Sequence, residues 1–333
     1  MRVVIAPDKF KGTLTAQQAA DAMTAAVRER WPAALVTVVP MADGGDGTLA
    51  ALGGATRSTA VTGPRGAAVA AAWRLDGDTA VIESAAASGL VLAGGASGND
   101  PWRATTRGVG ELIALALDAG ATRVVVGTGG VATTDGGRGA LEALAGWTPF
   151  REGQVVVLTD TTVAFEEAAR VFGPQKGADP AMVARLTSRL AQDAADWAVR
   201  YGMDVRGMPR SGAAGGLSGA LAAAGAELVD GAAFVAEAMG LAGAIASADL
   251  VVTGEGAFDA TTLAGKGPGH VLALAAEWGV PAVVVAGIVA AGVTREGAAV
   301  FSITETVGAE QAWADPATAV RRTTAAALAR LGD

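Results

Sequence analysis

The scarce lysines are the residues whose distribution first points to chemistry. Of the 25 Lys and Arg residues, four are lysines and the other 21 are arginines, and each lysine lies in a short run rich in Gly, Asp or Pro. A lysine ammonium is a compact point charge that suits phosphate oxygens, whereas the planar guanidinium suits carboxylates. The pattern favours a phosphate-binding site, with chance in an Ala-, Gly- and Arg-rich composition as the alternative. The four are Lys9, Lys11, Lys176 and Lys266.

An acidic, glycine-rich turn follows the second apolar run of the chain. Residues 43–48 read Asp-Gly-Gly-Asp-Gly-Thr, so the carboxylates of Asp43 and Asp46 stand three positions apart. Mg²⁺ needs few protein oxygens when phosphates and water complete its coordination, and this turn can supply them. A solvated Asp/Gly turn is the alternative.

Three further runs place glycines where a phosphate could meet the backbone. The glycines of residues 128–137 would let N–H groups approach an anion, while the hydroxyls and Asp135 add donors and a base. Residues 211–217 precede an alanine-rich stretch, and a helix N-terminus there would favour a phosphate. Structural turns and close packing of small residues explain these two runs equally well. In residues 253–259, a predicted strand-to-turn element, two acids and several glycines precede Lys266.

Composition and missing motifs exclude several classes of function. Cysteine is absent, which excludes disulfides and thiolate metal sites, and a net charge of −8 argues against nucleic acid or an anionic membrane as partner. The chain has neither a Walker A loop nor a GxGxxG fingerprint, so a P-loop NTPase and a nicotinamide dehydrogenase are disfavoured. His270 is the only histidine, which disfavours a His-ligated metal. Asp8 comes too early for a signal peptide, and we expect a cytoplasmic enzyme.

The elements that must position these residues are short apolar strands and alanine-rich helices. At both ends of the chain they alternate: we expect strands at 3–6, 36–39, 249–253, 282–286 and 299–303, and a helix from about Ala16 to Arg30 with Thr15 as N-cap. Continuous apolar strands separated by helices predict a parallel sheet covered on both faces, with ligands at the carboxyl ends of its strands.

The middle of the chain has a different pattern of apolar and polar residues. Residues 59–75 alternate like an antiparallel pair around the turn at 63–66, and further strands are expected at 81–83, 124–126 and 155–158. The sequence therefore predicts an α/β chain of two domains. A discontinuous Rossmann-like domain (1–56 and 226–333) carries an inserted mixed-sheet α/β domain (57–225), and the active site lies in the cleft between them.

Seven runs together resemble, in order, the motifs of the two-domain glycerate kinase family. The resemblance spans nearly the whole chain and implies ATP- and Mg²⁺-dependent phosphorylation of D-glycerate, giving 2-phosphoglycerate. The matching runs are residues 6–12 (Ala-Pro-Asp-Lys-Phe-Lys-Gly), 42–48 (Ala-Asp-Gly-Gly-Asp-Gly-Thr), 85–90, 105–113, 172–178 (Phe-Gly-Pro-Gln-Lys-Gly-Ala), 212–216, and 253–256 through 265–266.

Several polar positions of that family are altered here. The motif residues that would bind phosphate and metal are kept, whereas polar side chains at other motif positions are lost. Kinase chemistry is therefore better supported than glycerate as the substrate. The chain is also shorter than typical members around residues 146–154. The altered positions are Val131 (usually Ser), Thr134 (Asn), Val163 (Asn), Ala257 (Arg) and Ala260–Thr261 (Ser-Gln).

Roles follow for the candidate residues. We assign Asp135, Lys266, Asp8 and Lys11 to catalysis, with Lys11 and Lys266 on phosphates and Asp135 favoured over Asp8, Asp160 and Asp259 as proton acceptor. The predicted metal ligands are Asp43, Asp46 and Glu255. Predicted substrate contacts are Arg65, Arg107, Asp160 and Asp259, the arginines holding a carboxylate. Predicted nucleotide contacts are Gly44, Gly45, Gly129, Gly130, Gly215, Gly216, Gly254 and Lys266.

Two rival functions stay open on sequence alone. One is a kinase of the same fold that acts on another small hydroxy acid or polyol, which the altered polar positions favour. The other is a paralogue that binds a nucleotide or sugar acid without turnover, which the retained Asp43, Asp135 and Lys266 disfavour.

Overall fold

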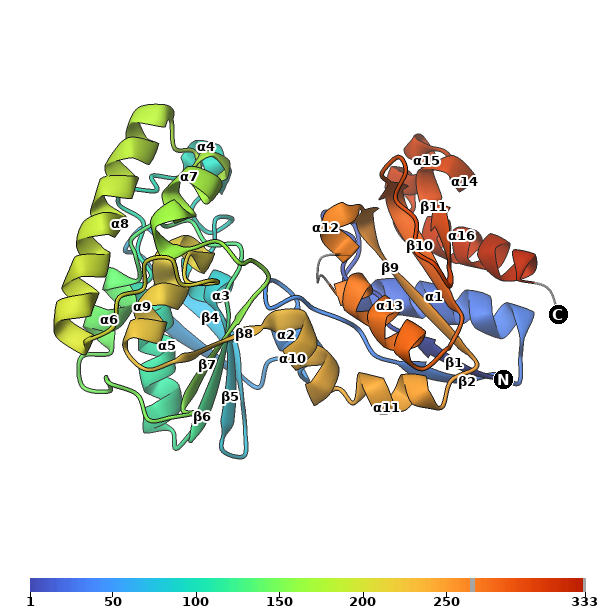
Figure 1. The fold of residues 1–333 in the computed structure, drawn as a ribbon, viewed down its shortest axis with the longest axis horizontal. Helices are drawn as coiled ribbons and strands as arrows, with labels where there is room; N and C mark the ends of the chain where they lie inside the picture. The colour runs from blue at the N-terminus through green and yellow to red at the C-terminus, as the bar shows by residue number, and fades with distance from the viewer. Residues whose placement is uncertain (264–266, 332–333) are drawn as a thin grey trace. The chain divides into compact units, whose positions relative to one another are not determined.

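The computed structural model describes residues 1–263 and 267–331. The chain divides into two compact units (Figure 1): unit 1 comprises Met1–Asp43 and Ala232–Asp333, and unit 2 comprises Gly44–Gly231. One unit is therefore discontinuous in sequence and the other is inserted into it. The Rossmann-like α/β domain and the inserted mixed-sheet domain are both present, so the predicted fold class is confirmed.

Unit 1 is built on a five-stranded sheet in the order β11-β10-β9-β1-β2, and all of its strand pairs are parallel. β9 is longer than the sequence predicted. The glycine-rich residues 254–256 continue the strand instead of turning, because β9 pairs with β10 as far as Phe258. The strands are β1 (Arg2–Ile5), β2 (Leu35–Val38), β9 (Leu250–Phe258), β10 (Ala282–Val289) and β11 (Ala298–Ser302).

Helices cover both faces of this sheet. α1 (Ala16–Arg30) and α16 (Pro316–Arg330) pack on the face that carries Val3 and Ile5, whereas α11 (Leu241–Ala246) and α13 (Gly267–Glu277) pack on the face that carries Val4 and Ala6. Thr15 is the N-cap of α1, as predicted, and it forms a capping box with Gln18. The remaining helices are α10 (Gly231–Ala238), α12 (Ala260–Leu263), α14 (Ile303–Val307) and α15 (Ala309–Ala314).

Unit 2 is built on a six-stranded mixed sheet in the order β3-β4-β5-β6-β7-β8. The pairs β3–β4 and β4–β5 are antiparallel, and the other three are parallel. The antiparallel pair predicted around residues 63–66 is confirmed. The strands are β3 (Arg57–Thr62), β4 (Ala68–Asp76), β5 (Thr79–Glu83), β6 (Arg123–Gly127), β7 (Val155–Thr159) and β8 (Glu227–Asp230).

The largest apolar core of unit 2 includes Trp73, Leu112, Phe165 and Leu190, and a small separate cluster is formed by Ala93, Ala104 and Ala132. α8 is the longest helix and lies along one side of the unit (Figure 1). The α-helices are α2 (Thr48–Ala51), α3 (Ser84–Ser88), α4 (Gly95–Gly98), α5 (Arg107–Asp118), α6 (Arg138–Ala143), α7 (Ala168–Phe172), α8 (Pro180–Tyr201) and α9 (Leu217–Ala223); the 3₁₀ helices are η1 (Phe165–Glu167), η2 (Pro174–Lys176) and η3 (Ala213–Gly216).

The division between the units falls at 43/44 and 231/232, whereas the sequence placed it at 56/57 and 225/226. Two contacts explain the difference. Glu83 at the end of β5 accepts hydrogen bonds from the N–H groups of Gly47 and Leu49, which ties the start of α2 to unit 2. At the other boundary, β8 pairs with β7 and so completes the mixed sheet.

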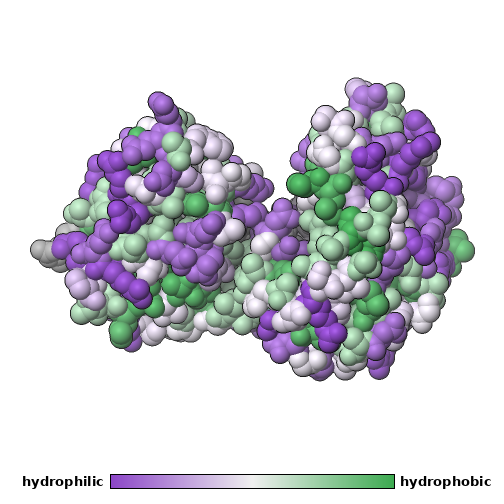
Figure 2. Space-filling view, turned by 180° about the vertical axis from the view of Figure 1, so that it is seen from behind, coloured by the Kyte–Doolittle hydropathy of each residue, from purple (hydrophilic) through white to green (hydrophobic). Residues whose placement is uncertain are grey.

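No helix within the described residues combines the length and the apolar character that crossing a membrane requires. On the face drawn in Figure 2, hydrophilic residues are interspersed with hydrophobic ones over both units.

Candidate active site

The carboxyl end of β1 gathers three of the charged residues singled out in the sequence. Lys9 Nζ lies 3.1 Å from Asp43 Oδ1 and 3.9 Å from Asp8 Oδ1. The Asp8 N–H donates to the carbonyl of Gly254, so β1 and β9 stay hydrogen-bonded at this end of the sheet. Asp8 and Asp43 thus share one ammonium group at the edge where a parallel sheet places its ligands.

Asp8 is the most perturbed acid of this group. Only 5% of the residue is exposed. Burial raises the pKa of Asp8 to about 6, a rise that the charge of Lys9 opposes and that of Asp43 reinforces. A carboxyl with such a pKa is half ionised near pH 6, which suits a group that accepts a proton at neutral pH.

The end of β9 lies beside the segment that follows β1. A Cβ on Gly256 would lie 3.3 Å from the Lys11 nitrogen of the backbone. Glu255 is buried, and its Oε1 accepts a hydrogen bond of 2.5 Å from Thr262 Oγ1. Asp259 accepts three hydrogen bonds from Thr261 and Thr262 and so caps α12. Lys266 lies outside the described residues.

In unit 2, the loop of residues 128–137 is held by side chains that bind its carbonyl groups. Asn99 Nδ2 donates to the carbonyl of Ala132, Lys176 Nζ to that of Thr133 and Arg189 to that of Thr134, over 2.8, 2.6 and 2.5 Å. Because three successive carbonyls are fixed, the loop has one defined path. Lys176 is therefore a buried structural donor, and burial lowers its pKa to about 8.

Asp135 at the end of this loop is surrounded by donors. Its Oδ2 accepts from the N–H and the hydroxyl of Thr106 at 2.8 and 2.9 Å and from the Gly139 N–H at 3.3 Å, while its Oδ1 accepts from the Gly137 N–H at 3.1 Å. These contacts join the beginnings of α5 and α6. Asp135 is thus a carboxylate that organises the backbone, with hydrogen bonds to both of its oxygens.

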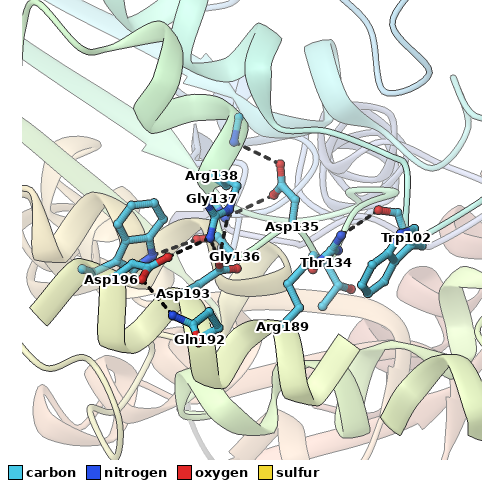
Figure 3. Close-up of polar contacts among 12 residues, drawn as sticks. Trp102, Thr134, Asp135, Gly136, Gly137, Arg138, Arg189, Gln192, Asp193 and Asp196 are labelled. Atoms are coloured by element: carbon cyan, nitrogen blue, oxygen red, sulfur yellow. Dashed lines mark hydrogen bonds and ion pairs between the residues drawn. The ribbon is translucent and has the colours of Figure 1, made fainter. Parts of the chain in front are cut away.

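An ion cluster around the buried Asp193 lies next to this loop (Figure 3). Arg138 pairs with Asp193, which is fully buried, and with the more exposed Asp196 at 3.1 Å. Arg189 lies on α8, as Asp193 does. It donates to the carbonyl of Trp102 and lies over the Trp102 ring at 4.4 Å from its centroid. Burial raises the pKa of Asp193, and the hydrogen bond from Arg138 opposes this rise.

The glycines of residues 211–217 serve close packing. Gly215 has a φ of +68°, and a Cβ on it would lie 2.2 Å from the carbonyl oxygen of Thr133. A Cβ on Gly216 would lie 2.8 Å from the ring of Phe165. All seven residues of α9 are buried. Of the two sequence interpretations, the structure favours close packing of small residues over a phosphate at the helix start.

The two predicted glycine turns of unit 2 do come together. A Cβ on Gly129 would lie 2.8 Å from the Gly45 Cα, and a Cβ on Gly130 would lie 3.0 Å from Asp46 Oδ1. Gly44 packs against Leu158 at the end of β7. Residues 44–46 and 129–130 therefore meet at the carboxyl ends of β6 and β7.

The remaining predicted contacts are dispersed. Arg65 and Asp160 are exposed, and Arg107 forms an i,i+4 ion pair with Glu111 at 3.0 Å. Gly254 lies inside the sheet, where a Cβ would stand 2.0 Å from the Val285 carbonyl oxygen, so packing explains this glycine. Within residues 1–263 and 267–331, no group of three or more His, Asp or Glu side chains is arranged to hold a metal ion.

Sequence reasoning missed the side chains that hold the unit 2 loop. Asn99, Arg189 and Asp193 carry no motif. One signal was nevertheless present: Asp193 stands three residues after Leu190 and seven after Leu186, in the apolar stripe of a helix. A carboxylate in that stripe predicts a buried partner.

The sequence profile of the glycerate kinase family matches residues 3–159 and 148–332. The chain belongs to the glycerate kinase family. The glycerate 2-kinase of Escherichia coli K12 is 39% identical over 350 residues, which covers 92% of each chain. The glycerate kinase of Bacillus subtilis 168 is 37% identical over 339 residues, or 90% of this chain and 87% of the relative.

A solved structure agrees with this assignment. The crystal structure of a protein assigned as glycerate kinase 2 of Salmonella typhimurium LT2 has a TM-score of 0.80 and 36% identity, and the likeness covers 99% of this chain and 98% of that one. The resemblance found in the seven sequence runs and the prediction of a kinase-type phosphotransferase are confirmed.

Proposed function

We propose that this glycerate kinase family member transfers the γ-phosphoryl group of ATP, with Mg²⁺, to the 2-hydroxyl of D-glycerate. The observation that carries the proposal is the group of Asp8, Lys9 and Asp43 at the carboxyl end of β1, with Lys11 just beyond it. The name of the Escherichia coli relative, a glycerate 2-kinase, supports the 2-hydroxyl as acceptor.

Asp8 is the proton acceptor in this proposal. Its carboxylate takes the proton of the substrate hydroxyl while the hydroxyl oxygen attacks the γ-phosphorus and the bond from that phosphorus to the β,γ-bridging oxygen breaks. Its raised pKa supports this role. Asp135, favoured on sequence alone, suits it less because Thr106, Gly137 and Gly139 already donate to both of its oxygens.

Positioning and charge neutralisation supply the rest of the chemistry. Lys11 contacts the phosphates, and Lys266 keeps its sequence-based assignment to them. Mg²⁺ would be held by few protein oxygens, with phosphates and water completing its coordination. Among the predicted metal ligands, Glu255 suits Mg²⁺ best. It is buried near the end of β9 and oriented by Thr262, whereas Asp43 is paired with Lys9. When bound, the ion would neutralise charge on the transferred phosphate.

One experiment tests reaction and position together. Purified protein is incubated with ATP, MgCl₂ and D-glycerate, and the product is read by proton-coupled ³¹P NMR. Phosphate on the 2-oxygen couples to one proton and gives a doublet, whereas phosphate on the 3-oxygen couples to two and gives a triplet. A triplet would move the acceptor to the 3-hydroxyl, and no ADP formation at all would favour the non-catalytic paralogue.

Ala257 makes the substrate preference testable. It is half-buried in β9, opposite Ile288, at the position where the family usually has arginine. If that arginine binds the substrate, its loss removes a charge-assisted hydrogen bond, so Ala257→Arg should raise kcat/KM for D-glycerate about 10- to 150-fold. The measurement compares glycerate, erythronate, threonate and glycerol. A wild type that prefers glycerate a hundredfold, with no gain in the variant, would show that the pocket is unchanged.

A further inference from the structure

A cavity of about 140 Å³ lies at the carboxyl ends of four strands of unit 1. Lys11 follows β1, Gly256 lies near the end of β9, and Gly287 and Ile288 lie near the end of β10. Beyond the end of β11, Thr304 and the indole of Trp313 on α15 complete the wall, so the cavity opens where a parallel sheet presents its ligand site.

The cavity borders the point where the chain reverses its direction across the sheet. α1, which follows β1, packs on the face that carries Ile5, whereas α13, which follows β9, packs on the opposite face. β1 and β9 are neighbours in the sheet. Such a reversal leaves a crevice between adjacent strand ends, and open α/β sheets bind their ligands there.

The chemistry of the lining suits a flat ring system joined to an anion. The walls are mainly apolar, and two of their large side chains remain exposed, Trp313 at 67% and Ile288 at 55%. An exposed indole and an exposed aliphatic chain in the lining of one cavity offer two apolar surfaces. Lys11 lines the same cavity and is exposed.

Size limits what the cavity can enclose. Clefts that bury a whole drug-sized ligand measure roughly 300–1,000 Å³. The 140 Å³ here leaves room for one ring system, with the rest of the ligand outside. A nucleotide meets both conditions, because its base is flat and apolar on its faces and its phosphates are anionic.

We propose that this cavity binds the base of the ATP molecule, with the indole of Trp313 stacked on one face of the base and Lys11 directed to the phosphates. The inference rests on the proposed function, since it assigns a place to the phosphoryl donor. It adds a residue, Trp313, that belongs to none of the family motifs identified in the sequence.

The test is isothermal titration of MgADP into wild type, Trp313→Ala and Trp313→Phe. Base stacking on an aromatic ring predicts a Kd for MgADP roughly 5- to 150-fold higher in Trp313→Ala and near wild type in Trp313→Phe, which keeps a ring. Trp278→Ala is the matched control, since Trp278 is 52% exposed in the same unit but lies outside the cavity. The Kd of Trp278→Ala for MgADP should equal that of the wild type.

Inorganic tripolyphosphate separates the base from the phosphates. Its Kd should rise in Lys11→Ala and stay unchanged in Trp313→Ala. Equal MgADP affinity in Trp313→Ala and wild type, or an equal loss for tripolyphosphate, would overturn the base site. If the wild type meanwhile turns over ATP and glycerate, only this inference fails; a wild type that binds no MgADP and consumes no ATP overturns the proposed function as well.

Discussion

We expect Asp8→Asn to lower kcat about 10²- to 10⁴-fold and, at pH 8, to raise the melting temperature of the protein. The loss of activity follows from removing the group that accepts the hydroxyl proton. The gain in stability follows from burial, because Asp8 is only 5% exposed and its charged form is costly in the folded state.

The sign of the pH effect follows from the direction of the shift. The folded state holds the Asp8 proton up to about pH 6, whereas the unfolded chain releases it near 3.8. Between these values the folded state binds more protons, so stability falls as the pH rises, and the full cost, at most about 3 kcal/mol, is present above pH 6. Asparagine carries no charge and escapes this cost. Melting curves should be recorded in EDTA without nucleotide, at pH 5 and pH 8.

Asp78→Asn is the matched control with the opposite sign. The hydrogen bond from Thr122 lowers the pKa of Asp78, so its charge stabilises the folded state above the unfolded pKa. That variant should melt slightly earlier at pH 8 and keep the wild-type kcat. An Asp8→Asn enzyme with near-normal kcat would place the proton acceptor elsewhere, and a lower melting temperature at pH 8 would mean that the charged form of Asp8 is not penalised.

We expect Arg138→Ala to lower the stability of unit 2, by less than the about 3–5 kcal/mol typical of a fully buried pair, because the Arg138 side chain is 44% exposed and partly screened by solvent. The substitution leaves Asp193, whose side chain is fully buried, without its arginine partner. Asp193 should then take up a proton more readily, because burial already raises its pKa. The deficit should therefore be larger at pH 8 than at pH 5. Urea unfolding followed by tryptophan fluorescence at both pH values measures it.

Two variants show whether the unpaired charge of Asp193 causes the loss of stability in Arg138→Ala. Asp196→Ala removes the more exposed partner of the same arginine and should change the unfolding midpoint little. Replacing Arg138 by Met and Asp193 by Leu together removes the buried carboxylate along with its partner and should recover much of the lost stability. A double variant as unstable as Arg138→Ala would show that packing, not charge, sets the cost.

The sequence predicted the regular elements of the fold well because they are local. Thr15 and Gln18 encode the start of α1 within four residues, and the β-branched runs encode the strands. Strand length was harder. The glycines at 254–256 indicate a turn on their own, yet β10 lies alongside and extends β9 to Phe258 through backbone pairing that no local pattern contains.

The candidate site was only partly predictable, for a similar reason. Asp8, Lys9 and Asp43 lie at strand ends, so topology alone brings them together. The surroundings of Asp135 depend instead on donors far away in sequence, such as Thr106, and motif reading could not distinguish a reactive carboxylate from one that holds backbone. The glycine-rich run around Lys176 likewise suggested a phosphate ligand, whereas in the structure its ammonium group donates to the carbonyl of Thr133.

The pairing of β1 with β9 constrains how the protein folds as it is synthesised. Val3 of β1 aligns with Leu250 of β9, and the whole of unit 2 is encoded between them. A nascent chain leaves the ribosome from its N-terminus, and domains generally fold as units. All strands of unit 2 are synthesised before β9, while β1, α1 and β2 still lack β9 as a partner in their sheet. The sheet of unit 1 can therefore be completed only after the whole of unit 2 has been synthesised.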